Sequence, residues 1–316
     1  MTTLISETQR VPINASGTRL DQVAAELFPG FSRSKLQTWI KDGNLLVDGR
    51  KVKANAKLGG GELLILEAET REEGDWGAED IALDIVYQDD AIIVINKPID
   101  LVVHPAAGNW DGTLLNGLIF HFPELRHVPR AGIVHRLDKD TSGLMVVART
   151  LESQSALVAQ LQERTVSRTY RAIVYGLCEL DGRIETQIDR HPHLRTKMAV
   201  VRSGGKTAIT HYRCLESFGY STYVELKLET GRTHQIRVHM NHAGWSLAGD
   251  QTYKDIHITR ELRESEEYEV LKAFPRQALH AKKLGLVHPT TSEYVEWETP
   301  LPEDMRVLLN DVKNCS

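Results

Sequence analysis

Residues 131–148 read Ala131-Gly132-Ile133-Val134-His135-Arg136-Leu137-Asp138-Lys139-Asp140-Thr141-Ser142-Gly143-Leu144-Met145-Val146-Val147-Ala148, a charged loop between two apolar runs. Short apolar runs bounded by glycine are typical of buried strands, so we expect strands at 131–134 and 144–148. The loop 135–143 alternates positive and negative side chains, whereas a loop that only turned the chain would use Gly, Asn or Pro. Because loops held on rigid strands often present catalytic residues, this stretch predicts a functional site.

Length and composition indicate a globular protein of about two domains, taking ~150 residues per domain. The chain has 316 residues, of which 41% are hydrophobic and 26% charged, as in ordinary soluble proteins. No apolar run approaches the ~18 residues of a membrane span. Residues 1–10 lack the apolar core of a signal peptide, so we expect a cytoplasmic protein. The scattered Cys178, Cys214 and Cys315 have no metal-ligand spacing and are expected to be inert thiols.

Charge is distributed unevenly along the chain, although the formal net charge is only −5. Residues 19–57 hold eight Lys and Arg against four Asp and Glu, and residues 190–213 hold six Lys and Arg with no acid. Residues 67–90 hold ten acids and one arginine, and so offset the basic segments in the total. Basic stripes on an acidic protein can bind a polyanion, although solvated surface charge is the alternative reading.

The N-terminal segment predicts a small module of helices and strands. Apolar side chains recur with helical spacing over 20–28 and again over 32–43. Residues 45–52 predict a hairpin on the turn Asp48-Gly49. A further strand is expected at 63–66, because four consecutive apolar residues stand there.

This module resembles the S4 RNA-binding domain over about fifty residues, from Arg19 to Leu66. The resemblance implies that the outward side of the second helix and the hairpin contact the RNA backbone, while a purely structural cap domain is the alternative. The residues expected to make these contacts are Arg33, Lys35, Lys41, Arg50, Lys51 and Lys53.

The rest of the chain predicts an α+β domain with a mixed sheet, because strands and helices alternate without a regular βα repeat. Strands are expected at 85–87, 92–96, 170–175, 222–228 and 295–299, and helices at 114–122 and 153–164. The expected organisation is an N-terminal extension (1–16), an S4-like domain (17–68), a flexible acidic linker (69–80) and a second domain (81–316).

Three segments of the second domain could carry chemistry. They are the loop 135–143, the segment 231–239 (Gly-Arg-Thr-His-Gln-Ile-Arg-Val-His) and the segment 168–171 (Arg-Thr-Tyr-Arg). Each has a structural alternative: Asp138 could cap a turn, Arg237 could form a structural ion pair, and Tyr170 could be a half-buried strand residue.

Two other chemistries would use some of the same residues. Asp138 and Asp140, with the later segment 249–255, resemble the aspartate pairs of haloacid-dehalogenase-type phosphotransferases, which work beside magnesium. That motif follows an unbroken apolar strand, whereas His135 and Arg136 interrupt it here. The 13 histidines suggest zinc, but no nearby carboxylate completes a ligand set. We therefore expect no metal.

Taken together, the three segments resemble the pseudouridine synthases of ribosomal RNA, most closely the D type of the large subunit. The resemblance runs from Ile85 to about Pro300 and includes the motifs 96–98 (Asn-Lys-Pro) and 277–281 (Gln-Ala-Leu-His-Ala). It implies a catalytic domain on a mixed, mostly antiparallel sheet with flanking helices, preceded by an S4 domain. It also implies that the substrates are several uridines of helix 69 in 23S RNA.

The resemblance also assigns roles to single residues. Asp138 is the carboxylate at the sugar–base junction, Arg237 keeps it ionised, and Tyr170 stacks on the base and transfers a proton at ribose C2′. Arg136 fills the gap that the flipped uridine leaves in the RNA. The candidates for backbone contacts in this domain are Arg130, Arg190, Arg195, Lys197, Arg202 and Lys206.

The reaction implied here needs no cofactor. It breaks the N1–C1′ bond of uridine, rotates the base and rejoins it through C5, with no net redox change or hydrolysis. Whether Asp138 attacks C1′ or assists removal of the C2′ proton stays open. We expect a monomer whose partner is large-subunit ribosomal RNA, with no membrane contact. The alternative function is a non-catalytic S4-type assembly factor that binds ribosomal RNA.

One segment departs from the family pattern. After Gly249-Asp250 the chain continues through residues 252–255 into a charged insertion, 259–274, which we expect to be helical. The insertion leaves the proposed catalytic residues intact, but it can change which RNA element docks.

Overall fold

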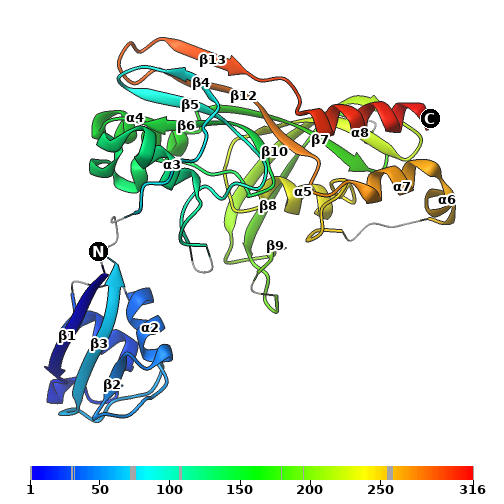
Figure 1. The fold of residues 1–316 in the computed structure, drawn as a ribbon. Helices are drawn as coiled ribbons and strands as arrows, with labels where there is room; N and C mark the ends of the chain where they lie inside the picture. The colour runs from blue at the N-terminus through cyan, green and yellow to red at the C-terminus, as the bar shows by residue number, and fades with distance from the viewer. Residues whose placement is uncertain are drawn as a thin grey trace. The chain divides into compact units, whose positions relative to one another are not determined.

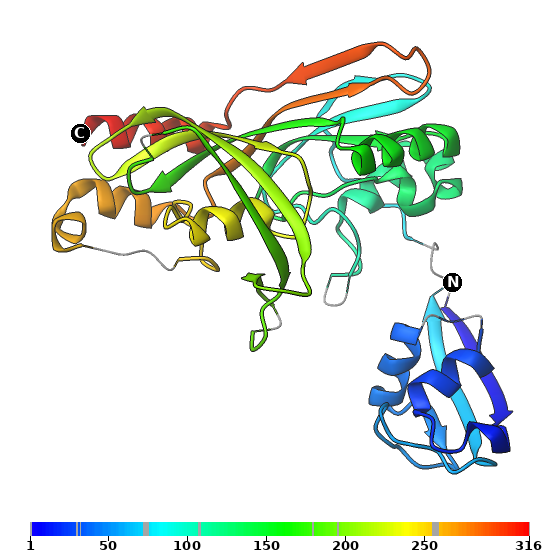
Figure 2. The same cartoon turned by 180° about the vertical axis from the view of Figure 1, so that it is seen from behind.

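The computed structural model describes residues 2–29, 31, 33–71, 76–106, 109–178, 180–194, 196–254 and 259–315. The chain divides into two compact units, Met1–Asp75 and Trp76–Ser316 (Figures 1 and 2). Within the described ranges, no helix is long and apolar enough to cross a membrane.

The small unit packs two helices against a three-stranded antiparallel sheet with the strand order β1-β3-β2. Its elements are β1 (Thr2–Arg10), η1 (Ile13–Ala15), α1 (Leu20–Leu27), α2 (Arg33–Asp42), β2 (Leu45–Val47) and β3 (Leu63–Arg71). Leu20 and Val23 of α1 and Leu36 and Ile40 of α2 are fully or almost fully buried. The helical spacing predicted this core.

Strand pairing in the small unit differs from the expected hairpin. The turn at Asp48 (φ 47°) and Gly49 (φ 73°) forms as expected. The residues after the turn do not form a strand, however, and β2 pairs with β3 instead. The arm after the turn carries exposed cations, so it gains little from a sheet, whereas Leu64 and Leu66 of β3 bury completely. Residues 2–10, expected to be an extension, pair with β3 as β1. Ser32, the expected start of α2, lies outside the described residues.

The large unit is built on one sheet, which has ten strands in the described part of the chain. The order is β4-β5-β6-β12-β7-β11-β10-β8-β9, and β13 pairs with β12. Every pairing is antiparallel except that of β6 with β12, so the expected mixed, mostly antiparallel sheet is confirmed. The strands are β4 (Ile85–Gln88), β5 (Ile92–Lys97), β6 (Ser142–Ala148), β7 (Ser167–Tyr175), β8 (Gly182–Arg190), β9 (Met198–Val201), β10 (Lys206–Ser217), β11 (Ser221–Leu228), β12 (Leu279–Val287) and β13 (Tyr294–Glu298).

Helices cover both faces of this sheet. They are α3 (Leu114–His121), α4 (Leu151–Glu163), α5 (Gln235–His242), α6 (Arg260–Glu264), α7 (Glu266–Ala273) and α8 (Glu303–Asn314), with the short turns η2 (Pro123–His127) and η3 (Pro129–Gly132). Because successive strand residues point to opposite faces, Ile93 and Ile95 of β5 belong to the core on the side of α3 and α5, while Ile92 and Val94 belong to the core on the side of α4. Helices α7 and α8 cover Ile173 and Tyr175 of β7 (Figure 1).

The prediction of a strand at residues 131–134 is wrong. Ala131 and Gly132 end η3, Ile133 makes an isolated bridge to Val147, and Val134 has no regular structure. Arg130, Ala131 and Gly132 all have positive φ, which no strand can follow. The run is apolar because it is buried in the core, and burial alone does not distinguish a strand from an irregular segment.

The other expected elements are present, with ends shifted by a few residues. Strands β4, β5, β6, β7, β11 and β13 and helices α3 and α4 lie where the sequence predicted them. The insertion 259–274 is helical but breaks at Ser265 into α6 and α7, which are capped by the hydroxyls of Thr259 and Ser265. Residues 255–258 lie outside the described residues.

Candidate active site

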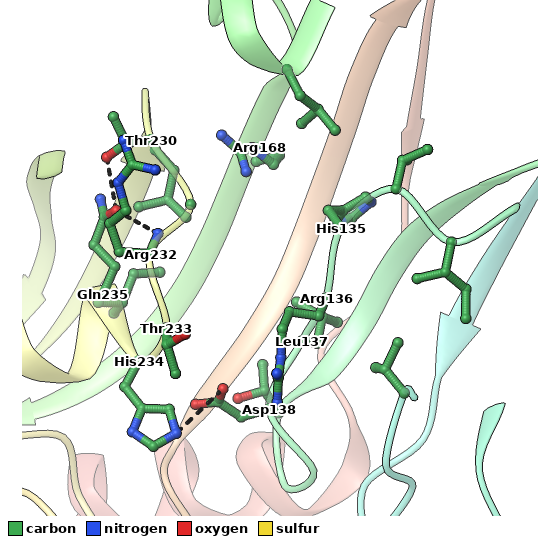
Figure 3. A pocket seen from close by; sticks show the side chains of 18 of the residues that line it. His135, Arg136, Leu137, Asp138, Arg168, Thr230, Arg232, Thr233, His234 and Gln235 are labelled. Atoms are coloured by element: carbon green, nitrogen blue, oxygen red, sulfur yellow. Dashed lines mark hydrogen bonds and ion pairs between the residues drawn. The ribbon is translucent and has the colours of Figure 1, made fainter. Parts of the chain in front are cut away.

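A cleft of about 790 Å³ in the large unit collects all three segments that the sequence singled out. The loop from His135 to Asp138 and the segment from Thr230 to Gln235 face each other across it (Figure 3). Tyr170 of β7 and Arg237 also line the cleft. The sheet thus brings together residues that lie up to about a hundred positions apart in the sequence, such as Asp138 and Arg237. This is expected for a site assembled at the ends of strands.

Asp138 and Arg237 form an ion pair in this cleft. Arg237 Nη1 donates to Asp138 Oδ2 at 3.0 Å. The same guanidinium donates through Nε (2.7 Å) and Nη2 (2.9 Å) to Asp250, whose carboxylate is fully buried. Burial would lower the pKa of Arg237, but Asp250 and then Asp138 raise it above its usual value. Arg237 is therefore a permanent cation that is held in place by Asp250 and presented to Asp138.

His234 is a second neighbour of Asp138. It stands at the N-terminal end of α5 in the left-handed conformation (φ 55°), and its Nε2 lies 3.8 Å from Asp138 Oδ1 (Figure 3). Its Nδ1 forms a 2.8 Å hydrogen bond with the Tyr253 hydroxyl. Burial lowers the pKa of His234 despite the opposing charge of Asp138, so this imidazole is neutral at neutral pH. Asp138 Oδ1 is consequently the oxygen that faces the cleft without a charged donor.

Tyr170 supplies a buried aromatic ring to the cleft. The residue is 6% exposed, and its hydroxyl has no hydrogen-bond partner in the part of the chain that the structure describes. Burial raises the pKa of Tyr170, and Asp138 adds to this effect while Arg168 opposes it. The hydroxyl is therefore protonated at neutral pH and can donate to a bound molecule.

The loop after Asp138 is anchored residue by residue. Lys97 donates to the carbonyl of Lys139 at 2.9 Å and to two carbonyls of its own segment, and Arg276 donates to the carbonyl of Asp140 at 3.1 Å. Gln277 donates to the Thr141 hydroxyl at 3.2 Å. At Gly143 (φ 114°) a Cβ would lie 2.3 Å from the carbonyl oxygen of Ala281, so only glycine allows β6 to approach β12 this closely.

Lys97 is the most deeply buried of these anchors, with no exposed surface. Burial lowers the pKa of Lys97 to about 7, against the opposing carboxylates of Asp140 and Asp138. Its three carbonyl partners match the three N–H donors of an ammonium group.

The remaining candidates of the large unit fall into two groups. Arg136 and Arg130 line the cleft, and both are exposed. Arg190, Lys197, Arg202 and Lys206 lie on or beside the arm formed by β8, β9 and the start of β10 (Figure 2), outside the lining of the cleft. Lys197 lies over the ring of Tyr253 at 5.9 Å. Arg195 lies outside the described residues.

Two arginines of the small unit, Arg19 and Arg33, contact one buried carboxylate, that of Asp21. Asp21 accepts hydrogen bonds from Arg19, Arg33 and Gln37. Burial would raise the pKa of Asp21, but these donors hold it well below its usual range. Arg33 is therefore fixed in one orientation, while Lys35 lies over the rings of Phe31 and Trp39. The other four expected contact residues, Lys41, Arg50, Lys51 and Lys53, are exposed.

Several site residues were missed by sequence reasoning. Asp250 lies in the segment 249–255, which the sequence connected only with a phosphotransferase. The preceding residue is Gly249 (φ 72°), and a Cβ there would lie 2.0 Å from the carbonyl oxygen of Arg276, so the position requires glycine. Tyr253 and Arg276 gave no local signal, because their partners are distant in sequence. Among the described residues, no group of three or more His, Cys, Asp or Glu could hold a metal ion.

Comparisons with known proteins point to one family. Residues 91–242 match the family model of RNA pseudouridylate synthases, and residues 18–64 match that of S4 domains. The chain is 54% identical to ribosomal large subunit pseudouridine synthase D of Pseudomonas aeruginosa, covering 98% of this chain and 97% of that protein. It is 51% identical to the protein of the same name from Haemophilus influenzae, covering 94% and 92%.

Solved structures agree with these matches. The human RNA pseudouridylate synthase domain containing 4 is similar with a TM-score of 0.57 at 26% identity, over 72% of this chain and 92% of that one. The human RNA pseudouridylate synthase domain containing 1 has a TM-score of 0.54 at 29% identity, over 71% and 85%.

Proposed function

The chain belongs to the RNA pseudouridylate synthase family, and we propose that it converts several uridines in helix 69 of 23S ribosomal RNA to pseudouridine. The names of its relatives support the large-subunit RNA as substrate. Members of this family are isomerases. Membership therefore argues against the two alternative functions, a phosphotransferase and an assembly factor that binds RNA without catalysis. The S4 domain supports a second contact with the same RNA.

The observation that carries the mechanism is the ion pair of Asp138 and Arg237 in the cleft. A carboxylate enclosed by a bound nucleotide would tend to take up a proton, because desolvation disfavours its charged form. The charge-assisted bond from Arg237 opposes this, and this is the role that we propose for Arg237. The Oδ2 atom of Asp138 is occupied by Arg237, which leaves Oδ1 as the atom to act on the ribose.

Tyr170 and Arg136 serve the substrate on either side of Asp138 in this proposal. The target uridine must leave its stack to enter the cleft, at a cost of a few kcal/mol when it is paired. The flat ring of Tyr170 can stack on the extruded base, and its protonated hydroxyl can donate to the sugar or the base. The exposed guanidinium of Arg136 can stack in the space that the base leaves and contact phosphate.

The net reaction balances without another reactant. The C1′–N1 bond breaks and a C1′–C5 bond forms; the proton lost from C5 is matched by one gained at N1. The residues here bind, orient and move protons, and Lys97 and Arg276 hold the loop that carries Asp138.

Mapping pseudouridine in ribosomal RNA tests the proposal. Carbodiimide-based mapping is applied to cells that lack the protein and are complemented with wild type, Asp138→Asn or Asp100→Asn. Asp138→Asn should restore no pseudouridine while retaining RNA binding within a few-fold. Asp100→Asn is the matched control and should restore all sites, because the exposed Asp100 carboxylate forms its ion pair, within the described residues, with Lys139 of the loop that carries Asp138.

The positions that reappear with wild type identify the substrate. Modified sites elsewhere in the 23S RNA would refute the assignment to helix 69 but leave the reaction intact. Identical modification in all strains would refute the function.

A further inference from the structure

Arg168 is a buried cation in the cleft with no carboxylate partner among the described residues. It is 6% exposed, and its Nε has no hydrogen-bond acceptor. Its Nη2 makes only a long contact, 3.5 Å, with the carbonyl of Glu229. A buried charge that is neither paired nor fully hydrogen-bonded is costly, so this guanidinium is unsatisfied in the free protein.

The surrounding carboxylate is already engaged. Glu229 Oε1 lies 2.7 Å from His211 and 3.9 Å from Arg183, and its Oε2 lies 3.4 Å from Arg164. Burial lowers the pKa of Arg168, with only Tyr170 opposing the shift. The position therefore carries positive charge that the described part of the protein does not neutralise.

The local backbone makes room for this guanidinium. Residue 231 is glycine, and a Cβ there would lie 2.7 Å from Arg168 Nη1. In Figure 3 the Arg168 side chain lies between His135 and the segment from Thr230 to Arg232, away from Asp138. Arg168 and Tyr170 are two residues apart on β7 and line the same cleft, which places them ~7 Å apart along the strand.

We propose that Arg168 binds a non-bridging phosphate oxygen of a phosphodiester beside the target uridine. An anion both supplies the missing acceptor for Nε and neutralises the charge, whereas a base carbonyl does only the first. The cleft favours a polyanion in general, since Arg130, Arg136 and Arg232 line it as well. This inference rests on the proposed function, because it assumes that an RNA strand enters the cleft.

Replacing Arg168 by methionine tests the proposal, because the substitution should preserve or raise the stability of the free protein and lower its affinity for RNA. Methionine keeps much of the apolar stem and removes the unpaired charge, so Arg168→Met should unfold at the same temperature as wild type or higher in the absence of RNA. Its affinity for a helix 69 stem-loop RNA should fall 10- to 100-fold. The slope of log affinity against log salt should decrease by ~0.7, the value for one phosphate contact on a single strand. Arg168→Lys should recover part of the affinity.

A scan of neutral linkages identifies the phosphate. Methylphosphonates are placed one at a time around the target uridine, each on a 2′-O-methyl sugar and compared with the same sugar carrying a normal phosphate. One linkage should weaken binding to wild type but not to Arg168→Met. Arg183→Met is the control, since Arg183 is 43% exposed, pairs with Glu185 and Glu229, and does not line the cleft; it should show the wild-type pattern.

Two results would overturn the inference. In the first, every methylphosphonate lowers the RNA affinity of wild type and of Arg168→Met by the same factor. In the second, Arg168→Met is less stable than wild type but binds RNA equally well, which indicates a structural role for Arg168. Pseudouridine formation by the wild type is measured on the unmodified RNA. If the wild type modifies this RNA but the scan is negative, only the role of Arg168 fails; if it modifies no RNA, the proposed function fails.

Discussion

At the scale of single residues, Arg237 contacts two carboxylates in different ways. It donates two hydrogen bonds to the buried Asp250 and one to Asp138. Because a bidentate pair fixes the plane of a guanidinium, Asp250 determines where Nη1 points. The ring of Tyr253, 5.0 Å from Arg237 Cζ, supports the same orientation. The site thus positions one charged donor at Asp138 Oδ2 and none at Oδ1 among the described residues.

The Tyr170 hydroxyl can be tested apart from its ring. Tyr170→Phe keeps the stacking surface and removes a hydroxyl whose pKa is raised by burial, so RNA affinity should stay within about two-fold. The single-turnover rate should fall by about 10²- to 10⁴-fold, the usual contribution of a positioned proton donor. Tyr175→Phe removes a hydroxyl from the opposite face of the same strand and should be unchanged in rate. A Tyr170→Phe rate within three-fold or so of wild type would exclude the hydroxyl from the chemistry.

At the scale of elements, the loop 135–143 depends on supports from distant strands. Lys97 ends β5, and Arg276 and Gln277 lie just before β12, which begins at Leu279. Arg276 also pairs with Asp304 of α8 through two hydrogen bonds of 2.7 and 2.9 Å. The C-terminal helix is therefore connected to the loop that presents Asp138, although it contributes no side chain to the lining of the cleft.

Removing this support should slow the reaction without weakening RNA binding. In Arg276→Met the carbonyl of Asp140 loses its donor, and a shift of the loop by about 1 Å can cost ~10²-fold in rate. We expect a 10- to 100-fold lower single-turnover rate at unchanged affinity, partly restored in Arg276→Lys. Rates are measured well below the unfolding temperature of each variant.

The control for this experiment lies on the same helix. Arg306 forms an exposed pair with Glu303 one turn away on α8, and such pairs contribute little, so Arg306→Met should behave as wild type. An Arg276→Met enzyme of normal rate would show that the loop holds its position without this anchor.

The sequence predicted those parts of the site and the fold whose residues form a pattern along the chain. The loop 135–143 and the segment 231–239 carry their chemistry in consecutive residues, so both were found. Strands β8, β9 and β10 were not, because much of their surface is exposed or half-buried and their apolar pattern is weak. Arg276 was missed for another reason: its contact with the loop is to a backbone carbonyl 136 positions away, and no pattern of side chains records such a contact.

At the scale of the whole molecule, basic charge lies on two separately folded units of an acidic chain. The small unit carries Lys41, Arg50, Lys51 and Lys53 on its surface, and the large unit carries Arg190, Arg202 and Lys206 about its β8–β10 arm. Parts of the expected linker belong to the two units: residues 69–71 lie in β3, Gly77 accepts from Asn116, and Glu79 accepts from the backbone of Gly112. Residues 76–81 are therefore bound to the large unit.

The stability of the large unit should depend on two buried neutral histidines. Burial lowers the pKa of His239 and of His280 to about 4, whereas an unfolded histidine titrates near ~6.5. Below pH ~6.5 the unfolded chain binds protons that the folded chain does not, so the free energy of unfolding falls as the pH drops toward 4. Each histidine should account for roughly 2 kcal/mol of that loss at pH 5.

Denaturant titrations at pH 5 and pH 7.5 measure this loss. His239→Gln and His280→Gln should each lower stability at pH 7.5, because each histidine is hydrogen-bonded, His239 to Thr186 and Thr210 and His280 to Ser142. Each variant should also show a difference between the two pH values that is smaller than that of wild type by roughly 2 kcal/mol. His193→Gln removes an exposed imidazole and is the control. If all four proteins lose the same stability between the two pH values, the loss comes from other groups, either carboxylates or the other buried histidines, His135 and His234, whose pKa burial also lowers.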